Sequence, residues 1–452
     1  QNFQTTGKRA KIAPIPKAGN SDNPSNFRPI SLTSTSCKIL EHIILKHLTV
    51  LLESNGVLSS CQHGFRSGLS TTTQLTEVVH DLALSINNCT QTDIILLDFA
   101  KAFDSVCHNK LIAKLRSIIG DGILTNWVKD FLTNRSQYVL YDQVPSENLP
   151  VTSGVPQGSV LGPLLFLVFI NDITDNISCT IRLFADDCII YKEINSHSDH
   201  LALSDSLHHL SNWCDMWQMS INPKKTVCMT ITRKKEAIQY DYSIKGTRLE
   251  KVNAHKYLGV TITSSLRWDA HISNITSVAL RKLFYLRRCL RLAPHSTMLL
   301  AYTTYVRPVL EYANTVWFPY TVTNIQKLEN VQRKAARFIC NKYKRTDSPT
   351  NMLASSGLQT LAIRAKQARL KFLFQLLHNH YKIDPSLYIR PSDSRVIRHK
   401  HSHTLKEYSY RNDTFKHSFF PLAIREWNCL DSSITSAKSV SDFALKLENM
   451  FS

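Results

Sequence analysis

Two adjacent aspartates, Asp186 and Asp187, are the residues whose placement most directly suggests chemistry. Short apolar runs at 181–184 and 188–191 flank the pair and are rich in β-branched or aromatic residues. This pattern predicts a β-hairpin with the two carboxylates at or beside its tip. Adjacent like charges repel unless a cation lies between them or water surrounds them. The pair is therefore either a solvated turn or a site for a hard divalent cation such as Mg²⁺, completed by a substrate phosphate.

A third candidate carboxylate, Asp98, follows the continuous apolar run 94–97. Such a run is typical of a buried central strand, and we expect a helix over about 102–115 to follow it. The end of a buried strand presents a side chain on a rigid scaffold, which favours a role for Asp98 in chemistry. For the nearby Asp104, we expect helix capping or a local hydrogen bond.

Two loops carry side chains that could contact a substrate. Arg66 stands between glycines before a helix that opens near residue 70, where it could bind phosphate or simply be solvated. Gln157 stands between Gly154 and Gly158 on a proline-stiffened loop. There the backbone can approach a flat ligand closely while the amide side chain projects toward it.

The elements that must position these residues fall into two regions. Up to residue 263 the order strand, helix, strand, hairpin, helix, strand predicts an α+β sheet with helices on one face. Apart from the elements above, this region includes strands at 138–141, 227–231 and 256–262 and helices at 164–172 and 200–217. Beyond residue 263 an apolar period near 3.6 predicts amphipathic helices at 271–291, 295–313, 323–341 and 358–380.

Charge is distributed unevenly between these two regions. Of the net charge of +19, residues 1–263 carry +2 and residues 264–452 carry +17. A polyanion is therefore the expected partner of the second region. The basic side chains on its helices form either ordinary solvated faces or a surface that binds a nucleic-acid backbone. These side chains are Arg281, Arg287, Arg288, Arg333, Lys334 and Arg337.

Composition argues against a secreted disulfide scaffold and against a membrane span. The eleven cysteines are odd in number and lack zinc-ligand spacing, which favours a reducing intracellular compartment. The apolar run 160–170 is far shorter than the ~20 residues that a spanning helix needs. No signal peptide is visible, and because the first residue is Gln1 we expect the sequence to be part of a longer product.

Taken in order, seven segments resemble the motifs of reverse transcriptases from non-long-terminal-repeat retrotransposons, the LINE-like class, and most of all the Jockey type. The segments are Asn26-Phe-Arg-Pro-Ile-Ser-Leu32, Gln62-His-Gly-Phe-Arg66, Asp98-Phe-Ala-Lys-Ala-Phe-Asp104, Gly154-Val-Pro-Gln-Gly-Ser159, Phe184-Ala-Asp-Asp187, Asn222-Pro-Lys-Lys-Thr226 and Tyr257-Leu-Gly259. Two further segments, 307–312 and 331–337, look like the thumb of such elements. The resemblance therefore covers nearly the whole chain.

The resemblance implies a right-hand polymerase fold. Fingers and palm with an antiparallel sheet would occupy residues 1–263, and an α-helical thumb would occupy residues 264–345. Residues 346–452 would form a basic, mostly helical C-terminal region of unknown role. The endonuclease domain of Jockey-type elements and an RNase H-like acidic cluster are not visible in the sequence.

The activity that the resemblance implies is RNA-directed DNA polymerisation, with an RNA template, a DNA primer and dNTPs as partners. Asp98 and Asp186 would hold two Mg²⁺ ions, or Mn²⁺ in their place, and Asp187 would complete the acidic site. Two such ions ~4 Å apart clamp the attacking hydroxyl and the leaving group. Lys225 would lie near the leaving phosphate as a proton donor.

The resemblance also implies a nucleotide-binding set: Arg66, Phe99, Phe103, Gln157 and Gly158. In it, the ring of Phe103 would reject a 2′-hydroxyl, although packing in the core explains this ring equally well. Gln157 would lie against the incoming nucleotide, and Arg66 would reach its triphosphate.

Two other hypotheses compete with the polymerase. The chain could be a catalytically inactive, truncated remnant that only binds nucleic acid, but the three intact aspartates favour an enzyme. A host maturase or telomere-extending enzyme fits less well, because the thumb resemblance points to mobile elements. Nucleus and cytoplasm are the compartments expected from the resemblance, whereas template preference and oligomeric state are left open by the sequence.

Overall fold

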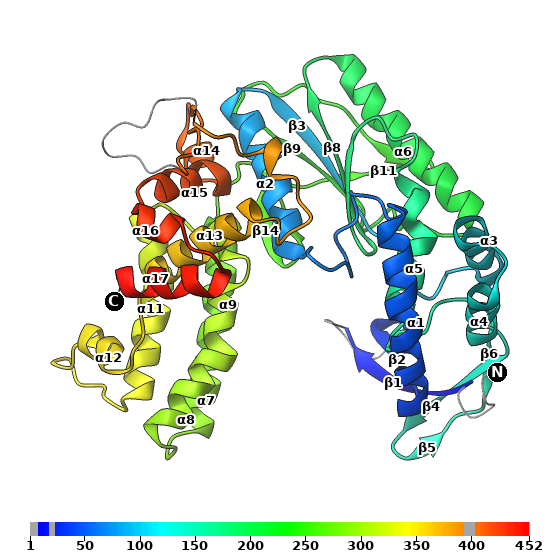
Figure 1. Cartoon of the computed structure of the whole chain (residues 1–452), viewed down its shortest axis with the longest axis horizontal. Helices are drawn as coiled ribbons and strands as arrows, with labels where there is room; N and C mark the ends of the chain where they lie inside the picture. The colour runs from blue at the N-terminus through cyan, green and yellow to red at the C-terminus, as the bar shows by residue number, and fades with distance from the viewer. Residues whose placement is uncertain (1–7, 18–22, 393–402, 452) are drawn as a thin grey trace.

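The computed structural model describes residues 8–17, 23–392 and 403–451. Figure 1 shows a central sheet from which two arms descend. One arm contains the N-terminal strands with α1, and the other contains α7, α11 and the C-terminal helices. Within the described residues, no helix is both long enough and apolar enough to cross a membrane.

The central sheet has five strands in the order β12-β9-β3-β8-β7. Its strands are β3 (Gln91–Leu97), β7 (Thr180–Phe184), β8 (Asp187–Ile194), β9 (Val227–Ile231) and β12 (Glu250–Lys251). Strand β3 pairs antiparallel with both β8 and β9, and every residue of β3 is buried. The expected buried central strand and the α+β fold class are therefore confirmed.

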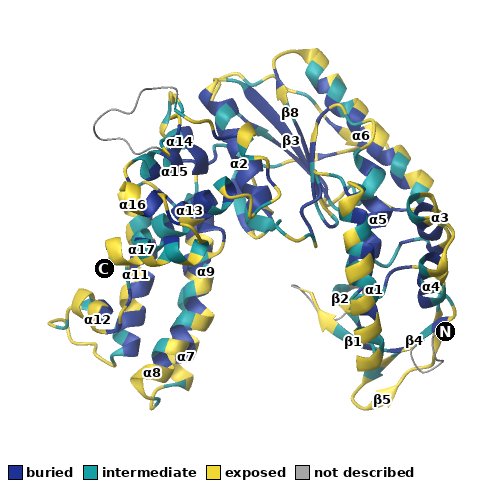
Figure 2. Cartoon of the chain, in the orientation of Figure 1, coloured by how far each residue is buried: buried dark blue, intermediate teal, exposed yellow. Residues whose placement is uncertain are grey.

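Helices cover both faces of this sheet, so the expectation of helices on one face was wrong. Alternate residues of β3 point to opposite faces. Ile94 and Leu96 pack with α2 (Thr71–Asn87) and the helices of the second arm. Ile95 and Leu97 pack with α5 (Gly162–Ile170) and α6 (His197–Trp217). Figure 2 shows β3 as buried, which is what a strand with apolar residues on both faces requires.

The first arm contains a second sheet and three helices. Its sheet follows the order β2-β1-β4-β5, with β6 also paired to β4. The strands are β1 (Arg9–Pro16), β2 (Phe27–Leu32), β4 (Arg135–Tyr141), β5 (Val144–Pro145) and β6 (Leu149–Val151), and the helices are α1 (Thr35–Ser54), α3 (His108–Ile119) and α4 (Ile123–Leu132).

Helix α3 begins six residues later than the sequence suggested. The chain first turns after β3, with Lys101 at φ +51°, and the Ala100 amide donates to the Ser220 carbonyl. The Asp104 amide then donates to the Lys101 carbonyl (2.9 Å), so the first residues of the expected helix form a turn instead.

The second arm is helical, as expected. It contains α7 (Asp269–Cys289), α8 (His295–Ala301), α9 (Arg307–Glu311), α10 (Asn314–Trp317), α11 (Val322–Ile339) and α12 (Pro349–Ser355). The single helix expected over 295–313 is interrupted by a π-helical segment, Tyr302–Val306. Pro308 lies in the first turn of α9, where its missing N–H costs little.

The C-terminal region continues with α13 (Leu361–Leu377), α14 (Asp413–Lys416), α15 (Phe419–Asn428), α16 (Ser432–Thr435) and α17 (Val440–Phe451). It has an apolar core of its own that includes Phe374, Phe420 and Trp427. The hairpin of β13 (Ala254–Tyr257) and β14 (Val260–Thr263) leads from the central sheet into α7.

Candidate active site

The acidic pair lies on a hairpin, as the sequence predicted. Strands β7 and β8 pair antiparallel, and Phe184 is opposite Asp187. The connecting loop therefore consists of Ala185 and Asp186. Ala185 has φ +54°, a conformation that is unfavourable for a residue with a Cβ. Hairpin loops of two residues commonly need a positive φ at this position.

Asp98 lies across the sheet from the same hairpin. Leu97 pairs with Cys188 in the antiparallel register of β3 and β8, so the next residue along, Asp98, is opposite Asp187. Residues opposite each other in such a ladder have Cα atoms about 5 Å apart. Two hydrogen bonds hold Asp98 in place: its amide donates to Thr226 Oγ1 (3.3 Å), and its carbonyl accepts from the Asn222 amide (2.8 Å).

The three carboxylates perturb one another. Burial, followed by repulsion from Asp186 and Asp98, raises the pKa of Asp187 to about 6. Burial and repulsion from Asp98 also raise the pKa of Asp186, while Arg28 opposes that rise. The Asp187 side chain still reaches solvent, so water screens part of the repulsion.

These residues suit a cation that arrives with its substrate better than a preformed metal centre. In residues 8–17, 23–392 and 403–451, no group of three or more His, Cys, Asp or Glu side chains could hold a metal ion by itself. Mg²⁺, however, is usually bound by one or two carboxylates together with substrate phosphates and water. A cation would also relieve the repulsion that raises the pKa values of Asp186 and Asp187. The donor set therefore fits Mg²⁺.

A cavity of about 280 Å³ adjoins Asp98 and Asp187 and is also lined by Lys225 and His255. Lys225 Nζ lies 3.9 Å from Asp98 Oδ2, and the two side chains are 70% and 44% exposed. The lysine is thus beside the acidic residues, and its role as a proton donor stays a prediction. A larger cavity of about 560 Å³ lies between α6 and the segment 240–246, and none of the three aspartates lines it.

The Gln157 loop packs against β2 and the segment after β3. The Gln157 side-chain amide donates to Asp104 Oδ1 (2.8 Å), and the Gln157 carbonyl accepts from the Ser31 amide (2.7 Å). The local hydrogen bond expected for Asp104 is therefore replaced by one to a residue 53 positions away. Gly158 has φ +99°, and an added Cβ would lie 2.8 Å from the Ser31 carbonyl oxygen, so this position needs glycine.

The two phenylalanines after Asp98 have different environments. Phe103 is half-buried and stacks on Phe166, with ring centroids 4.3 Å apart. The exposed Phe65 meets its edge at 6.3 Å. This placement is compatible with both interpretations of Phe103. Phe99 is only 6% exposed, and its ring packs in the core. Its burial argues against a nucleotide contact through the ring, and its place in the nucleotide-binding set stays a prediction.

Arg66 has a structural partner. Its Nε and Nη2 donate to the two carboxylate oxygens of Glu53 at 3.1 and 2.9 Å. Its Nη1 donates to the carbonyls of Ser59 (2.6 Å) and Gln62 (3.3 Å). The side chain is 8% exposed, which argues against the triphosphate role expected for it. The bidentate pair instead ties the loop before α2 to the end of α1.

Gln62 and Gly64, from the same motif, make the contact with the hairpin that the sequence did not reveal. The Gln62 side chain accepts from the Ala185 amide (2.9 Å) and donates to the Ala185 carbonyl (3.3 Å). It also accepts from the Gly64 amide (2.7 Å). An added Cβ at Gly64 would lie 2.3 Å from the Ala185 nitrogen. The motif was visible in the sequence, but nothing local showed that its target was residue 185.

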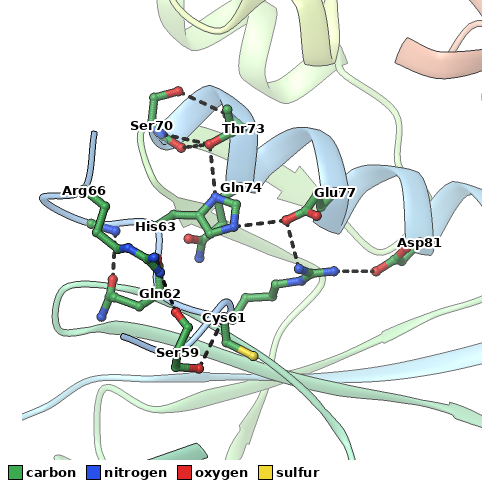
Figure 3. A network of polar contacts seen from close by, with 12 residues as sticks. Ser59, Cys61, Gln62, His63, Arg66, Ser70, Thr73, Gln74, Glu77 and Asp81 are labelled. Atoms are coloured by element: carbon green, nitrogen blue, oxygen red, sulfur yellow. Dashed lines mark hydrogen bonds and ion pairs between the residues drawn. The ribbon is translucent and has the colours of Figure 1, made fainter. Parts of the chain in front are cut away.

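Beneath this contact lies a buried polar network (Figure 3). His63 contacts Thr73 Oγ1 through Nδ1 (3.0 Å) and Glu77 Oε2 through Nε2 (3.1 Å). Arg182, on β7, donates to the same Glu77 oxygen (2.8 Å). Burial opposes ionisation of Glu77, but hydrogen bonds and positive charges from these partners more than offset it, so its pKa is lowered.

The basic side chains expected to bind nucleic acid divide into two groups. Those of Arg281, Arg287, Arg288, Arg333 and Lys334 are exposed on α7 and α11. Arg337 is different, because its guanidinium donates to the carbonyls of Lys344 (3.0 Å) and Asp347 (3.1 Å). Arg337 thus holds the loop after α11. These contacts compete with the role in binding a nucleic-acid backbone that we expected for it.

Comparisons with known proteins show the family to which the chain belongs. The family model "Reverse transcriptase (RNA-dependent DNA polymerase)" matches residues 15–262. A relative from Drosophila melanogaster, "Probable RNA-directed DNA polymerase from transposon X-element", is 29% identical over 351 residues, covering 75% of this chain and 38% of the relative. The "RNA-directed DNA polymerase from mobile element jockey" from the same species is 29% identical over 352 residues, with the same coverage.

The chain thus spans well under half the length of these relatives. Among solved structures, it is similar to an apo telomerase from Candida tropicalis with a TM-score of 0.47 and 11% identity, over 82% of this chain and 62% of that one. The family match covers more than half of the chain and includes all three aspartates. The chain belongs to the reverse transcriptase family.

Proposed function

We propose that this chain is the polymerase portion of a non-long-terminal-repeat retrotransposon and extends a DNA primer on an RNA template. The observation that carries the proposal is the register that brings Asp98 opposite Asp187, with Asp186 at the adjoining hairpin tip. Reverse transcriptases generally use divalent metal ions. Asp98, Asp186 and Asp187 would hold Mg²⁺, which when bound neutralises phosphate charge and activates the primer hydroxyl.

Other residues of the chain would orient the substrates around these aspartates. Gln157 would lie against the incoming nucleotide, and Phe103 would exclude a 2′-hydroxyl from its sugar. Because Arg66 is engaged by Glu53, Arg28 is the better candidate for the triphosphate. It is exposed on β2, and its charge acts on Asp186. Lys225 would lie near the leaving phosphate, beside Asp98.

Residues 1–263 would serve as fingers and palm, and residues 264–345 as the thumb. The exposed basic side chains of α7 and α11 support a role for the thumb in holding the primer–template backbone. Phosphate contacts of this kind fix position and carry no sequence information. The thumb would therefore hold many templates equally well.

Primer extension on an RNA template with dNTPs and Mg²⁺ tests the proposal, with Asp186→Ala as the control. The wild type should extend the primer, and Asp186→Ala should abolish extension while leaving primer–template affinity within about twofold, because phosphate contacts elsewhere supply the affinity. Equal activity in the two proteins would refute the site. Binding without extension by either would favour the inactive remnant.

A further inference from the structure

The C-terminal region encloses helix α2. Thirteen of the 17 residues of α2 are buried, although the central sheet can cover only one side of a helix. The second arm and the C-terminal region cover the rest. The Asn87 side chain accepts from the Arg411 amide (2.7 Å), and the Asn412 side chain donates to the Ile86 carbonyl (3.4 Å). Figure 1 shows α2 between the central sheet and α13 to α15.

One side chain of this region enters the buried network below the hairpin. Tyr388 Oη donates to Glu77 Oε1 at 3.0 Å. The Tyr388 residue is 9% exposed, and its ring stacks on Phe420, with centroids 4.5 Å apart and planes 5° apart. Packing of the ring thus holds the hydroxyl against Glu77. Both carboxylate oxygens of Glu77 therefore accept a hydrogen bond.

Two routes lead from Glu77 to the hairpin. The first passes through Arg182, which lies on β7 three residues before Ala185. The second passes through His63, whose backbone amide donates to the Leu183 carbonyl (2.8 Å). The segment that contains His63 also supplies the Gln62 side chain bound to Ala185. Both routes therefore end on the residues that precede Asp186.

The same C-terminal segment also holds the loop before α2. The Lys382 amide donates to the Gly68 carbonyl (3.1 Å), and Lys382 Nζ lies 2.9 Å from Glu53 Oε2. Glu53 is the residue that pairs with Arg66. The segment 382–388 thus has a contact at each end. Lys382 contacts the loop before α2, and Tyr388 contacts Glu77 in the buried network.

We propose that Tyr388 is a positioning residue for the catalytic hairpin, which gives the C-terminal region a role in polymerisation. Its hydroxyl holds Glu77, and Glu77 holds Arg182 and His63 against β7. The proposal rests on the proposed function only in taking this hairpin as catalytic. Its physical content is that the tip at Ala185 and Asp186 stays in one conformation because Tyr388, 202 positions after Asp186, completes its support through Glu77.

Tyr388→Phe tests the proposal, because it removes one hydroxyl and keeps the ring that stacks on Phe420. Tyr381→Phe is the matched control. Tyr381 is a half-buried tyrosine of the same C-terminal region, but its hydroxyl donates to Gln375 (3.1 Å), within that region. Two readouts are needed: hydrogen exchange of the peptide 180–190 in protein without metal, and single-turnover extension with Mg²⁺.

We expect Tyr388→Phe to speed exchange at 183–187 and to lower the single-turnover rate constant about tenfold, in keeping with the loss of a hydrogen bond to a charged group. The KM for dNTP and the Kd for primer–template should stay within twofold, and Tyr381→Phe should match the wild type in every readout. Equal effects of the two variants would overturn the proposal, as would unchanged exchange in Tyr388→Phe. Faster exchange in a protein whose wild type does not polymerise would support the positioning role and refute the proposed function.

Discussion

Gly64→Ala is the sharpest test of how closely the loop at residues 62–66 contacts the hairpin that carries Asp186. The new methyl group would lie 2.3 Å from the Ala185 nitrogen and 3.0 Å from both Gln62 Oε1 and the Phe184 carbonyl carbon. Two of these three atoms belong to backbone, which cannot rotate away as a side chain can. Gly64 is not among the residues with positive φ, so the effect would come from this contact and not from backbone strain.

The size of the effect follows from the distances. Ordinary contact for a Cβ begins near 3.4 Å, so the loop and the hairpin must separate by about 1.1 Å. Overpacking of this kind typically costs about 1–3 kcal/mol of stability. A displacement of about 1 Å in a catalytic group can cost about 10²-fold in rate. We therefore expect the single-turnover rate constant to fall about 100-fold in a protein that still folds.

The assay is single-turnover nucleotide incorporation at saturating primer–template and dNTP, with Tm measured on the same samples. Gly122→Ala is the matched control. An added Cβ there meets nothing within 4 Å, and its φ of −117° suits alanine. Since Gly122 is a helix N-cap, where alanine is disfavoured by about 1 kcal/mol, the control loses some stability but should keep its rate. A Gly64→Ala rate within twofold of wild type would refute the reasoning.

Two further predictions concern charge. The pKa of Asp187 is raised in the folded protein to about 6 from about 3.9 in an unfolded chain, so its ionised form destabilises the fold above pH 6 and the penalty fades as pH falls toward 4. Asp187→Asn should therefore raise the Tm of metal-free protein more at pH 8 than at pH 5.5, and an equal gain at both would contradict this. Replacing both Arg281 and Arg288 by alanine should reduce the log–log salt slope of primer–template binding by about 2. An unchanged slope in this double variant would exclude α7 from the binding surface. Arg337→Ala should instead lower Tm and leave the slope unchanged, because the Arg337 guanidinium holds a loop.

The features that the sequence predicted well are those encoded locally. The apolar run before Asp98 and the two runs around the acidic pair each specify a strand by their own pattern. The predicted strand over 227–231 coincides with β9. Once those strands pair, the antiparallel register brings Asp98 opposite Asp187.

The features that it missed depend on contacts between distant segments. The motif Gln62 to Arg66 offers an amide and a guanidinium, and local chemistry favours the guanidinium as the functional group. The structure pairs Arg66 with Glu53 and brings Gln62 to Ala185, 123 residues away. In the same way, the ring of Phe99 is buried because the chain turns after β3 and pairs with Ile221.

The enclosure of α2 also determines when, during translation, this helix can become fully covered. Glu77 and Tyr388 are separated by 311 residues. At about 5–20 residues per second, a ribosome needs about 15 to 60 s to make the intervening chain. Until then α2 lacks part of its cover, and Glu77 lacks one of its donors. A nascent chain therefore completes the support of the hairpin that carries Asp186 only after residue 388 has been synthesised.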